Sequence, residues 1–408
     1  MANSELIKKL VNAVNKKPKH NIIINAHMHI WNFDCIPVDF QNRYQGIPGS
    51  FDIVHPLLKV FKNIYKKEDA LDKTLDFLEI CRSRTLEDMV KVLMIEGACL
   101  DPDIKLIFTP LMMDMEYAVK DPEVKPRIPF PDQMRKTKDI VLKYPGRFLP
   151  FIAADPRRIR DFKNKGNPKD PHGIKYIQYA LETKGFWGVK IYPPLGYKPT
   201  NLYLLPLYDY CEEKEIPITA HCNFGGLYSA QGKSAGHYKS MANPKNWAPV
   251  LKNFPNLKLN LGHFGGDLVS KKGAKGVEWH KTIIGYFDTY PNVYADISYH
   301  EAMFKNHKKY FTRLEKYSRK DQIWKKILYG TDWWVNRLLC KEWIYLDMFL
   351  ALSGKYGIKK KQVSYILNRN AVNFLGLNNN SYTNGPLVNH VKFLAKNKKR
   401  LPPWFKFS

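Results

Sequence analysis

Eight short segments rich in β-branched and other apolar residues alternate with longer helical segments along this 408-residue chain. This alternation is the pattern of βα units, in which successive strands lie parallel in one sheet. Eight is also the number of strands that closes a (β/α)8 barrel. The sequence therefore predicts an α/β fold of the TIM-barrel type. The predicted strands are Asn21–Ile30, Lys105–Met112, Arg147–Ala154, Phe186–Tyr192, Ile216–Cys222, Asn256–His263, Asn292–Ser298 and Lys326–Asp332.

Helical segments stand between most of the predicted strands and after the last one. The clearest of them precede strands five to eight or follow strand eight. These helices are predicted at Leu202–Lys214, Trp247–Asn253, Lys275–Thr289, Tyr310–Trp324 and Ile358–Leu375.

Two connections are too long for simple crossovers, namely residues 31–103 after the first strand and residues 223–246 after the fifth. Long insertions over the carboxyl ends of barrel strands often build substrate pockets and lids. We expect the barrel to occupy residues 21–378, with a short amphipathic helix in residues 1–20 before it. A basic tail over residues 379–408 is expected to follow as an irregular arm.

The chain is strongly basic, because Lys and Arg outnumber Asp and Glu by 65 to 38, a formal net charge of +27. Such a balance can attract anionic substrates, nucleic acid or a membrane surface. The lysines lie in scattered pairs and triplets, and the sequence holds no RNA-recognition, zinc-finger or helix-turn-helix signature. We therefore expect a generally basic surface and a small carboxylated substrate, and no nucleic-acid partner.

The sequence features that report on cellular compartment favour the cytoplasm. No apolar run reaches the length that spans a bilayer, and residues 1–20 lack the apolar core of a signal peptide. The 6 cysteines form no Cys-x-x-Cys pair, which fits reduced thiols better than disulfides. A cytoplasmic protein without membrane association is expected.

Residues that bind metals well stand at the ends of four predicted strands. His27 and His29 end the first strand, and the side-chain period of two points them to the same face. His221 ends the fifth strand, His263 the sixth and Asp332 the eighth. The carboxyl ends of parallel strands meet at the mouth of a barrel, where active sites form. These residues therefore predict a transition-metal site and a metal-dependent enzyme.

Six motifs occur in a recognisable order over roughly residues 21–377. They are Asn25-Ala-His27-Met-His29, Gly188-Val-Lys190-Ile-Tyr-Pro-Pro, Ala220-His221-Cys, Leu261-Gly-His263-Phe-Gly-Gly, Tyr329-Gly-Thr-Asp332-Trp and Ile366-Leu-Asn-Arg-Asn-Ala. This ordered set resembles the amidohydrolase superfamily, in particular its amidohydrolase-related family 2 group. That group includes decarboxylases and lactonases of small carboxylic acids.

The resemblance implies that His27, His29 and Asp332 bind a primary metal ion, and that His221 completes a one-ion site or binds a second ion. Zn²⁺ is the expected ion, although the same ligands suit Mn²⁺, Co²⁺ or Fe²⁺, and one ion is favoured over two. Asp332 is the expected acceptor of a proton from an activated water molecule. His263 is either a ligand of a second ion or an acid/base that acts on the substrate.

Lys190 has three interpretations. Strand alternation points Lys190 and Tyr192 into the barrel, where a lysine needs a partner or a function. In two-ion members of the superfamily a lysine on this strand is carbamylated and bridges the ions. Alternatively, Lys190 binds a substrate carboxylate or forms a structural ion pair. Tyr192 is expected to contact substrate or to pack in the core.

Three residues near the predicted mouth have two interpretations each. Arg157, in Asp155-Pro-Arg157 after the third strand, could bind a substrate carboxylate or pair with a nearby acid. Trp333 and Trp334 could form the wall of an apolar pocket or pack within the barrel.

Strict alternation in the sixth strand points Leu257, Leu259 and Leu261 inward and Lys258 and Asn260 towards the helices, which fits a polar barrel interior poorly. A bulge near Gly262 would correct this for part of the strand. Cys222 is expected to face away from His221. The remaining histidines are predicted mostly in loops or on the surface. They are His20, His55, His172, His237, His280, His300, His307 and His390.

These features predict a metal-dependent hydrolase that opens a small carboxylated amide, lactone or ring compound with an activated water molecule. The alternative is a metal-dependent, non-oxidative decarboxylase of a small aromatic or unsaturated acid. The sequence barely separates the two reactions, because both use the same ligands. The resemblance also allows a homodimer.

Overall fold

The computed structural model describes the chain in nine stretches. The predicted helix of residues 1–20 and most of the insertion at residues 31–103 lie outside them. The described residues are 21–37, 77, 79–83, 85–98, 101, 103–229, 231–269, 275–378 and 385–407. Within these stretches, no helix combines the length and the apolar character that crossing a bilayer requires.

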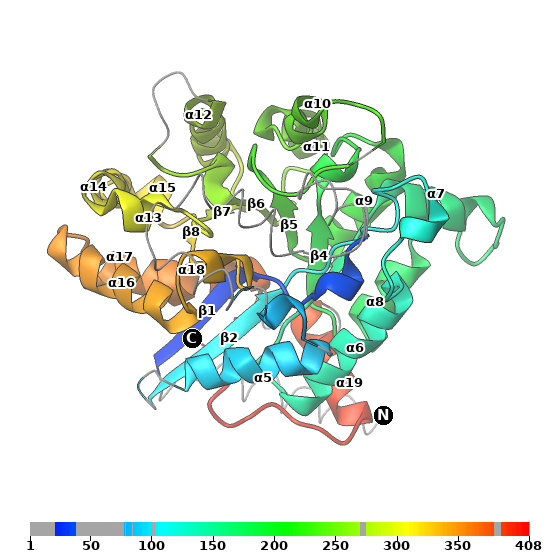
Figure 1. The fold of residues 1–408 in the computed structure, drawn as a ribbon, viewed down its shortest axis with the longest axis horizontal. Helices are drawn as coiled ribbons and strands as arrows, with labels where there is room; N and C mark the ends of the chain where they lie inside the picture. Colours follow the sequence, from blue (N-terminus) through cyan, green and yellow to red (C-terminus); the bar gives the residue numbers. More distant parts are fainter. Residues whose placement is uncertain are drawn as a thin grey trace.

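Eight parallel strands form the centre of the molecule (Figure 1). Every predicted strand is present, and each is shorter than predicted, because the apolar pattern extends beyond the hydrogen-bonded residues. The strands are β1 (Asn21–Met28), β2 (Ile104–Pro110), β3 (Phe151–Ala153), β4 (Gly188–Ile191), β5 (Ile218–His221), β6 (Leu259–Gly262), β7 (Val293–Asp296) and β8 (Ile327–Leu328).

Backbone hydrogen bonds join the pair β1–β2 to the run β3–β8 at both ends. The Phe108 amide donates to Arg147 O at 2.8 Å, and Phe108 O accepts from Leu149 N at 2.9 Å, which connects β2 to the segment before β3. On the other side, Ala26 N donates to Tyr329 O at 2.8 Å, which connects β1 to the residue after β8. These contacts close the sheet, and the predicted (β/α)8 barrel is confirmed.

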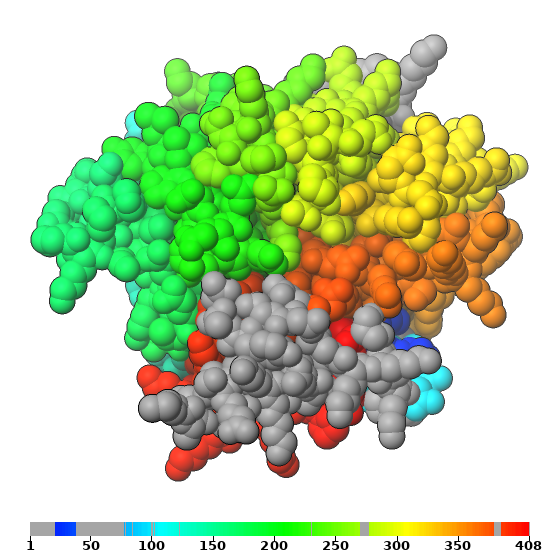
Figure 2. Space-filling model, turned by 180° about the vertical axis from the view of Figure 1, so that it is seen from behind, coloured from blue at the N-terminus to red at the C-terminus, as the bar shows by residue number. Residues whose placement is uncertain are grey.

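Helices surround the strands, and the view from behind shows successive segments following one another around the molecule from green through yellow to orange (Figure 1; Figure 2). They are α5 (Leu86–Gly97), α6 (Phe130–Lys143), α7 (Pro156–Asn164), α8 (Lys175–Thr183), α9 (Leu205–Glu213), α10 (Ala235–Ser240), α11 (Ala248–Asn253), α12 (Lys275–Thr289), α13 (Ala302–Lys305), α14 (His307–Ser318), α15 (Asp321–Trp324), α16 (Glu342–Lys355), α17 (Lys360–Ser364), α18 (Asn370–Leu375) and α19 (Pro386–Lys396). The predicted helix Tyr310–Trp324 is divided into α14 and α15, because Lys320 takes an extended backbone conformation.

The C-terminal segment forms a helix, α19, where the sequence predicted an irregular arm. Leu387, Val391 and Leu394 recur at helical spacing and are buried, and α19 lies against α8. His390 on the same helix is buried, and its Nδ1 donates to Gly185 O at 3.1 Å. The prediction of a loop or surface position for His390 is therefore wrong.

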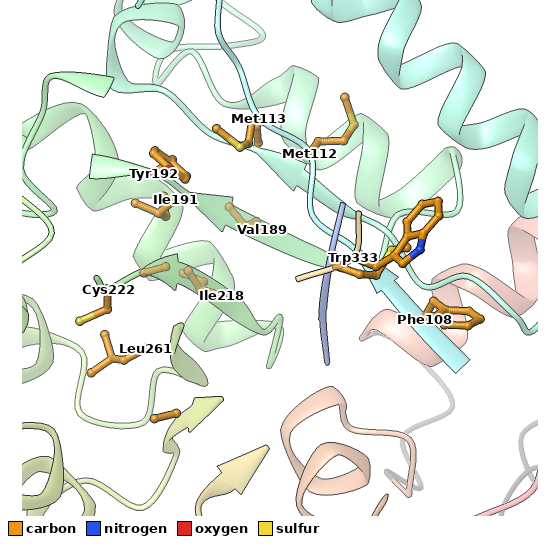
Figure 3. Close-up of a cluster of buried hydrophobic side chains, with 14 of the residues drawn as sticks. Phe108, Met112, Met113, Val189, Ile191, Tyr192, Ile218, Cys222, Leu261 and Trp333 are labelled. Carbon is orange, nitrogen blue, oxygen red and sulfur yellow. The ribbon is translucent and has the colours of Figure 1, made fainter. Parts of the chain in front are cut away.

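Polar and apolar residues alternate along the strands, and the polar ones point into the barrel. Lys190, Thr219 and Asn260 occupy neighbouring positions on β4, β5 and β6, and all three are buried. Their apolar neighbours belong to the hydrophobic cluster between the strands and the helices (Figure 3). In Figure 3 the labelled neighbours are Val189, Ile191, Ile218 and Leu261.

The sixth strand is therefore oriented opposite to the prediction. Asn260 points inward and donates to Asp296 Oδ2 at 2.8 Å, whereas Leu259 and Leu261 pack in the outer hydrophobic cluster. The leucines suggested an inward face because the helix-facing side of a barrel strand is as apolar as an ordinary core. Cys222 lies in the outer cluster, as predicted.

Candidate metal centre

His27 and His29 lie close together on and just after β1, and both rings are buried. The Nδ1 atom of His27 is 2.8 Å from Asp296 Oδ2. The Nδ1 atom of His29 is 2.7 Å from Leu111 O. A carboxylate and a carbonyl can only accept, so both rings carry their proton on Nδ1. Both Nε2 atoms therefore retain the lone pair that binds a metal ion.

Asp332 brings a carboxylate to these two nitrogens. Its Oδ1 is 3.2 Å from His29 Nε2 and 3.7 Å from His27 Nε2. One ligand atom from each of the three residues lies within 4.8 Å of the other two. His27 Nε2 is buried and has no hydrogen-bond partner among the described residues, which is costly for a polar atom unless a cation engages it. Two imidazoles and a carboxylate fit a divalent transition metal.

The backbones at the end of β6 and just after β8 approach His27 unusually closely, and a glycine in each permits this approach. A Cβ atom at Gly262 would lie 2.9 Å from His27 Cε1, and one at Gly330 would lie 2.8 Å from His27 Cβ. Asp332 itself has a left-handed backbone, with φ of 60°, and its amide donates to His27 O at 2.8 Å. The glycines let β6 and the end of β8 approach β1 closely enough for the ligand atoms to meet.

Burial controls the protonation of the three residues. It lowers the pKa of His27 to about 3, although Asp296 opposes the change, and it also lowers the pKa of His29. Burial alone would raise the pKa of Asp332, but its contacts with His29, His263 and His27 hold that pKa below its ordinary value. At neutral pH the imidazoles are neutral and the carboxylate is charged, as metal binding requires.

Asp296, the last residue of β7, is a central acidic residue that the sequence prediction did not include. Its Oδ2 accepts from His27 Nδ1 and Asn260 Nδ2, both at 2.8 Å. Its Oδ1 accepts from the amides of His263 at 3.0 Å and Ser298 at 3.1 Å, and from Ser298 Oγ at 2.5 Å. Its place at the end of a strand, like that of the predicted ligands, is the signal that could have identified it.

His263 lies next to His27, with ring centroids 4.6 Å apart. It follows Gly262, which already takes the inward position of β6. His263 reaches the interior because residues 263–266 all have positive φ, between 53° and 123°, so the strand ends in a left-handed turn. The structure thus places His263 beside the predicted ligands, where its role as acid/base stays a prediction.

Two buried histidines hold this turn. His300 Nε2 donates to His263 O at 3.0 Å, and His280 Nε2 donates to Gly266 O at 3.0 Å. The prediction of a loop or surface position is wrong for His280, which is buried in α12, whereas His300 lies in the loop between β7 and α13 and is buried there. Single histidines outside a strand or a motif carry no signal of such contacts in the sequence.

His221 contacts His263, with ring centroids 4.9 Å apart, but it does not join the three ligand atoms. Its Nε2 is 3.2 Å from Gly225 O, a contact in which the ring nitrogen donates. The structure therefore brings His221 into the site, and its predicted role as a metal ligand stays a prediction.

Lys190 and Tyr192 lie in the same interior. Lys190 Nζ is buried, 5.7 Å from the Tyr192 ring centroid, and makes no hydrogen bond to any described residue. Burial lowers the pKa of Lys190 to about 8, while Asp332 and Asp296 oppose the change. Tyr192 stacks on His221 with ring centroids 4.4 Å apart. The interior thus combines the three potential ligand atoms with a buried ammonium that forms no hydrogen bond to a described residue.

Arg157 is engaged elsewhere. Its guanidinium pairs with Asp155 and donates to Tyr117 O at 2.6 Å and to Leu195 O at 3.0 Å. Asp155 also caps α7 by accepting from the Arg157 amide at 2.9 Å. These contacts brace the loops after β2, β3 and β4. Substrate binding by Arg157 stays a prediction that none of them supports.

The two tryptophans after Asp332 differ in their surroundings. Trp334 packs against Trp31 at 4.6 Å and Phe77 at 4.7 Å between ring centroids, and Trp31 lies 5.8 Å from the His29 ring. Trp333 is buried in the core, where its Nε1 donates to Glu96 at 3.2 Å. Trp334 thus belongs to an aromatic wall that adjoins His29.

Solved structures show the same fold at low sequence identity. A 5-carboxyvanillate decarboxylase from Novosphingobium aromaticivorans, complexed with manganese and 4-hydroxy-3-methoxy-5-nitrobenzoic acid, is 13% identical, with a TM-score of 0.55 over 89% of this chain and 98% of that one. An uncharacterised TIM-barrel protein from Bordetella bronchiseptica is 17% identical, with a TM-score of 0.51 over 88% and 99%. A 2,6-dihydroxybenzoate decarboxylase complexed with 2,6-dihydroxybenzoate is 15% identical, with a TM-score of 0.50 over 87% and 99%.

Among curated proteins, no sequence matches this chain. A family model described as Amidohydrolase matches residues 24–377. The matched range runs from β1 to just past α18 and includes every residue of the three-ligand cluster. The chain therefore belongs to the amidohydrolase family of enzymes.

Proposed function

We propose that this enzyme is a metal-dependent, non-oxidative decarboxylase of a small aromatic or unsaturated carboxylic acid. The substrate carboxylate would leave as CO₂, and a proton would take its place on the same carbon. The observation that carries the proposal is the buried ammonium of Lys190, which has no hydrogen-bond partner among the described residues. A cation in this state is suited to bind a carboxylate beside the three metal ligands.

The metal ligands of the proposal are His27 Nε2, His29 Nε2 and Asp332 Oδ1. They would hold one divalent cation, which supplies a positive charge that draws electron density from the substrate when it is bound. Manganese is present in the solved 5-carboxyvanillate decarboxylase, and the same donors suit Zn²⁺, so both ions are candidates. His221 is the candidate for a fourth ligand.

The remaining residues of the site would orient the acid and move the proton. Lys190 would bind one carboxylate oxygen, and Tyr192 and Trp334 would provide apolar surface for a flat ring. His263 would give a proton to the carbon as the bond to CO₂ breaks, and it would regain that proton from solvent. The aromatic wall would exclude water from the carbon that carries the negative charge.

Hydrolysis of a carboxylated lactone, amide or ring compound is the second candidate. Asp332 lies where it could accept a proton from water, as the sequence analysis expects. The two solved decarboxylases with the same fold favour the proposal over hydrolysis.

The test is product analysis with the purified enzyme loaded with Mn²⁺ or with Zn²⁺. Substrates would include 2,6-dihydroxybenzoate and 5-carboxyvanillate, each labelled with ¹³C in the carboxyl group, and a panel of lactones and amides. The proposal predicts release of labelled CO₂ and, in D₂O, one deuterium at the carbon that carried the carboxylate. A His27→Ala variant should release none and serves as the control for contaminating activity. Ring or amide opening without loss of carbon would overturn the proposal in favour of hydrolysis.

A further inference from the structure

We infer that Ser298 is a positioning residue that holds the His263 ring with its proton on Nδ1 and with Nε2 free to take up and deliver a proton. The use of that proton in catalysis rests on the proposed function. The position of the proton on the ring rests on the geometry alone. It concerns a residue that lies two positions after Asp296, beyond the end of β7.

The proton of the Ser298 hydroxyl is committed to Asp296. Ser298 Oγ is 2.5 Å from Asp296 Oδ1, and Asp296 also accepts from two backbone amides and from Asn260 and His27. Five donors surround this buried carboxylate, which therefore acts only as an acceptor. A hydroxyl has one proton, so Ser298 Oγ can only accept from any other neighbour.

That neighbour is His263. Its Nδ1 is 2.9 Å from Ser298 Oγ and 3.1 Å from Ser298 O. The carbonyl cannot donate, and the hydroxyl has already given its proton to Asp296. The proton in this contact must therefore belong to His263 Nδ1, which leaves Nε2 bare in the neutral ring.

The rest of His263 is also fixed in place. Its amide donates to Asp296 Oδ1 at 3.0 Å, and its carbonyl accepts from His300 Nε2 at 3.0 Å. No described residue forms a hydrogen bond with its Nε2, and the ring packs between His27 and His221. Backbone and Nδ1 are thus both held, and Nε2 is the one polar atom of His263 left for a substrate.

The proton that His263 would deliver comes from solvent. Nε2 takes one proton from solvent, and the resulting imidazolium donates through Nδ1 to Ser298, which in turn donates to the negative charge of Asp296. When the bond between the substrate carbon and its carboxyl group breaks, CO₂ leaves and the electron pair stays on that carbon. The carbon takes the proton from Nε2, and His263 returns to the neutral form.

The direct test is ¹⁵N NMR of the Zn²⁺-loaded wild-type enzyme labelled in its histidines, with the His263 signals assigned by their loss in His263→Asn. The inference predicts that Nδ1 carries hydrogen and Nε2 does not. A His263 ring protonated on Nε2 alone would overturn it. This measurement needs no substrate, so its result is independent of whether the enzyme is a decarboxylase.

Variants test the positioning role in the full-length enzyme. Ser298→Ala should lower kcat by about ten- to a hundredfold, the usual effect of losing such a supporting contact, with KM and metal content unchanged. Ser298→Thr keeps the hydroxyl and should restore most of the loss. Ser353→Ala is the matched control, because the Ser353 hydroxyl is buried without a hydrogen-bond partner among the described residues. If Ser298→Ala folds, binds metal and retains the wild-type kcat, the role assigned to Ser298 is wrong.

Discussion

The Nδ1 atom of His27 lies 2.8 Å from Oδ2 of Asp296, so an acid on β7 determines which nitrogen of a β1 histidine faces the metal site. The same carboxylate accepts from the amide of His263 at 3.0 Å. One buried acid thus accepts from a histidine on β1 and from the histidine that follows β6. This relationship makes Asp296 the residue whose replacement should disturb the site most without removing a direct ligand.

Asp296→Asn should weaken metal binding by about ten- to a hundredfold. The Asn oxygen would stay with the amides of His263 and Ser298, so the amide nitrogen would face His27 Nδ1. His27 would then have to place its proton on Nε2 and lose the lone pair that binds the ion. Metal affinity measured by competition with a chelator checks this, with the exposed Asp288→Asn on α12 as control. Unchanged affinity would show that Asp296 does not set the His27 proton.

His27→Ala and His263→Asn should have different effects on metal content, because His27 is a proposed metal ligand and His263 a proposed acid/base. Loss of His27 removes one of three ligand atoms, so the ion and the turnover should both be lost. Loss of His263 should lower turnover by about a hundred- to ten-thousandfold and leave most of the metal bound. Elemental analysis of both purified variants measures the ions per chain. Equal metal loss in the two variants would instead indicate a two-ion site that includes His263.

Lys190→Met should raise stability and lower substrate affinity together. The pKa of Lys190 falls from 10.5 to about 8 on burial, so the folded state disfavours the charged form. The folded protein therefore gains stability as pH rises from about 8 to above 10, and at pH 7 it carries a cost of about 3 kcal/mol that the methionine removes.

Chemical unfolding at pH 7 and the KM for the carboxylated substrate measure the two effects of Lys190→Met. We expect a KM at least about tenfold higher, because the carboxylate loses its cation, with the metal content unchanged. Lys281→Met, at an exposed position of α12, is the control for removing a charge from this basic protein. A less stable Lys190→Met variant with the wild-type KM would show that Lys190 forms a structural ion pair.

Glu342→Gln should change how stability depends on pH. Glu342 is the buried first residue of α16, and its Oε1 accepts from Asn25 Nδ2 at 2.8 Å and its Oε2 from Asn336 Nδ2 at 3.2 Å. Burial, aided by the charge of Glu96, raises the pKa of Glu342 from 4.5 to about 7. The folded state thus holds this proton more tightly than the unfolded state does. The resulting stability is full below about pH 4.5 and is lost as pH rises through about 7.

Glutamine is neutral throughout, so the stability of the variant relative to wild type should rise by about 3 kcal/mol from pH 4.5 to pH 8. Urea unfolding of both proteins across this range measures the difference. Parallel curves would mean that Glu342 is charged at all these pH values. Asn336 Oδ1 lacks a partner among the described residues, so a turn of that amide could accept the new donor.

The barrel and the meeting of His27, His29 and Asp332 could be predicted from the sequence because both follow from periodicity. The period of two placed His27 and His29 on one face, and the strand ends brought Asp332 to them. Asp296 also ends a strand, but it lies outside every motif of the ordered set, so the sequence prediction does not include it. Lys190 was correctly expected inside, since Val189 and Ile191 mark the outer face.

Other features had no local signal. Which face of β6 points inward depends on the layer of helices outside the barrel. That layer buries Leu259 and Leu261 on the outer face, opposite to the prediction. His263 enters the site through a left-handed turn, and left-handed backbone at His263 and Phe264 is not readable from residue type. His280 and His300 support that turn through contacts with distant backbone carbonyls, which only the folded chain creates.

His27 on β1 and His29 just after it are oriented by different kinds of acceptor, and this gives the two histidines different evolutionary freedom. His29 donates to Leu111 O, a main-chain atom that no substitution can delete. His27 donates to a side chain, which a single base change can alter. In the proposed metal centre, selection can therefore adjust the electron-donating strength of His27 while that of His29 stays constant, so adaptation to a different ion would be expected to begin on the seventh strand.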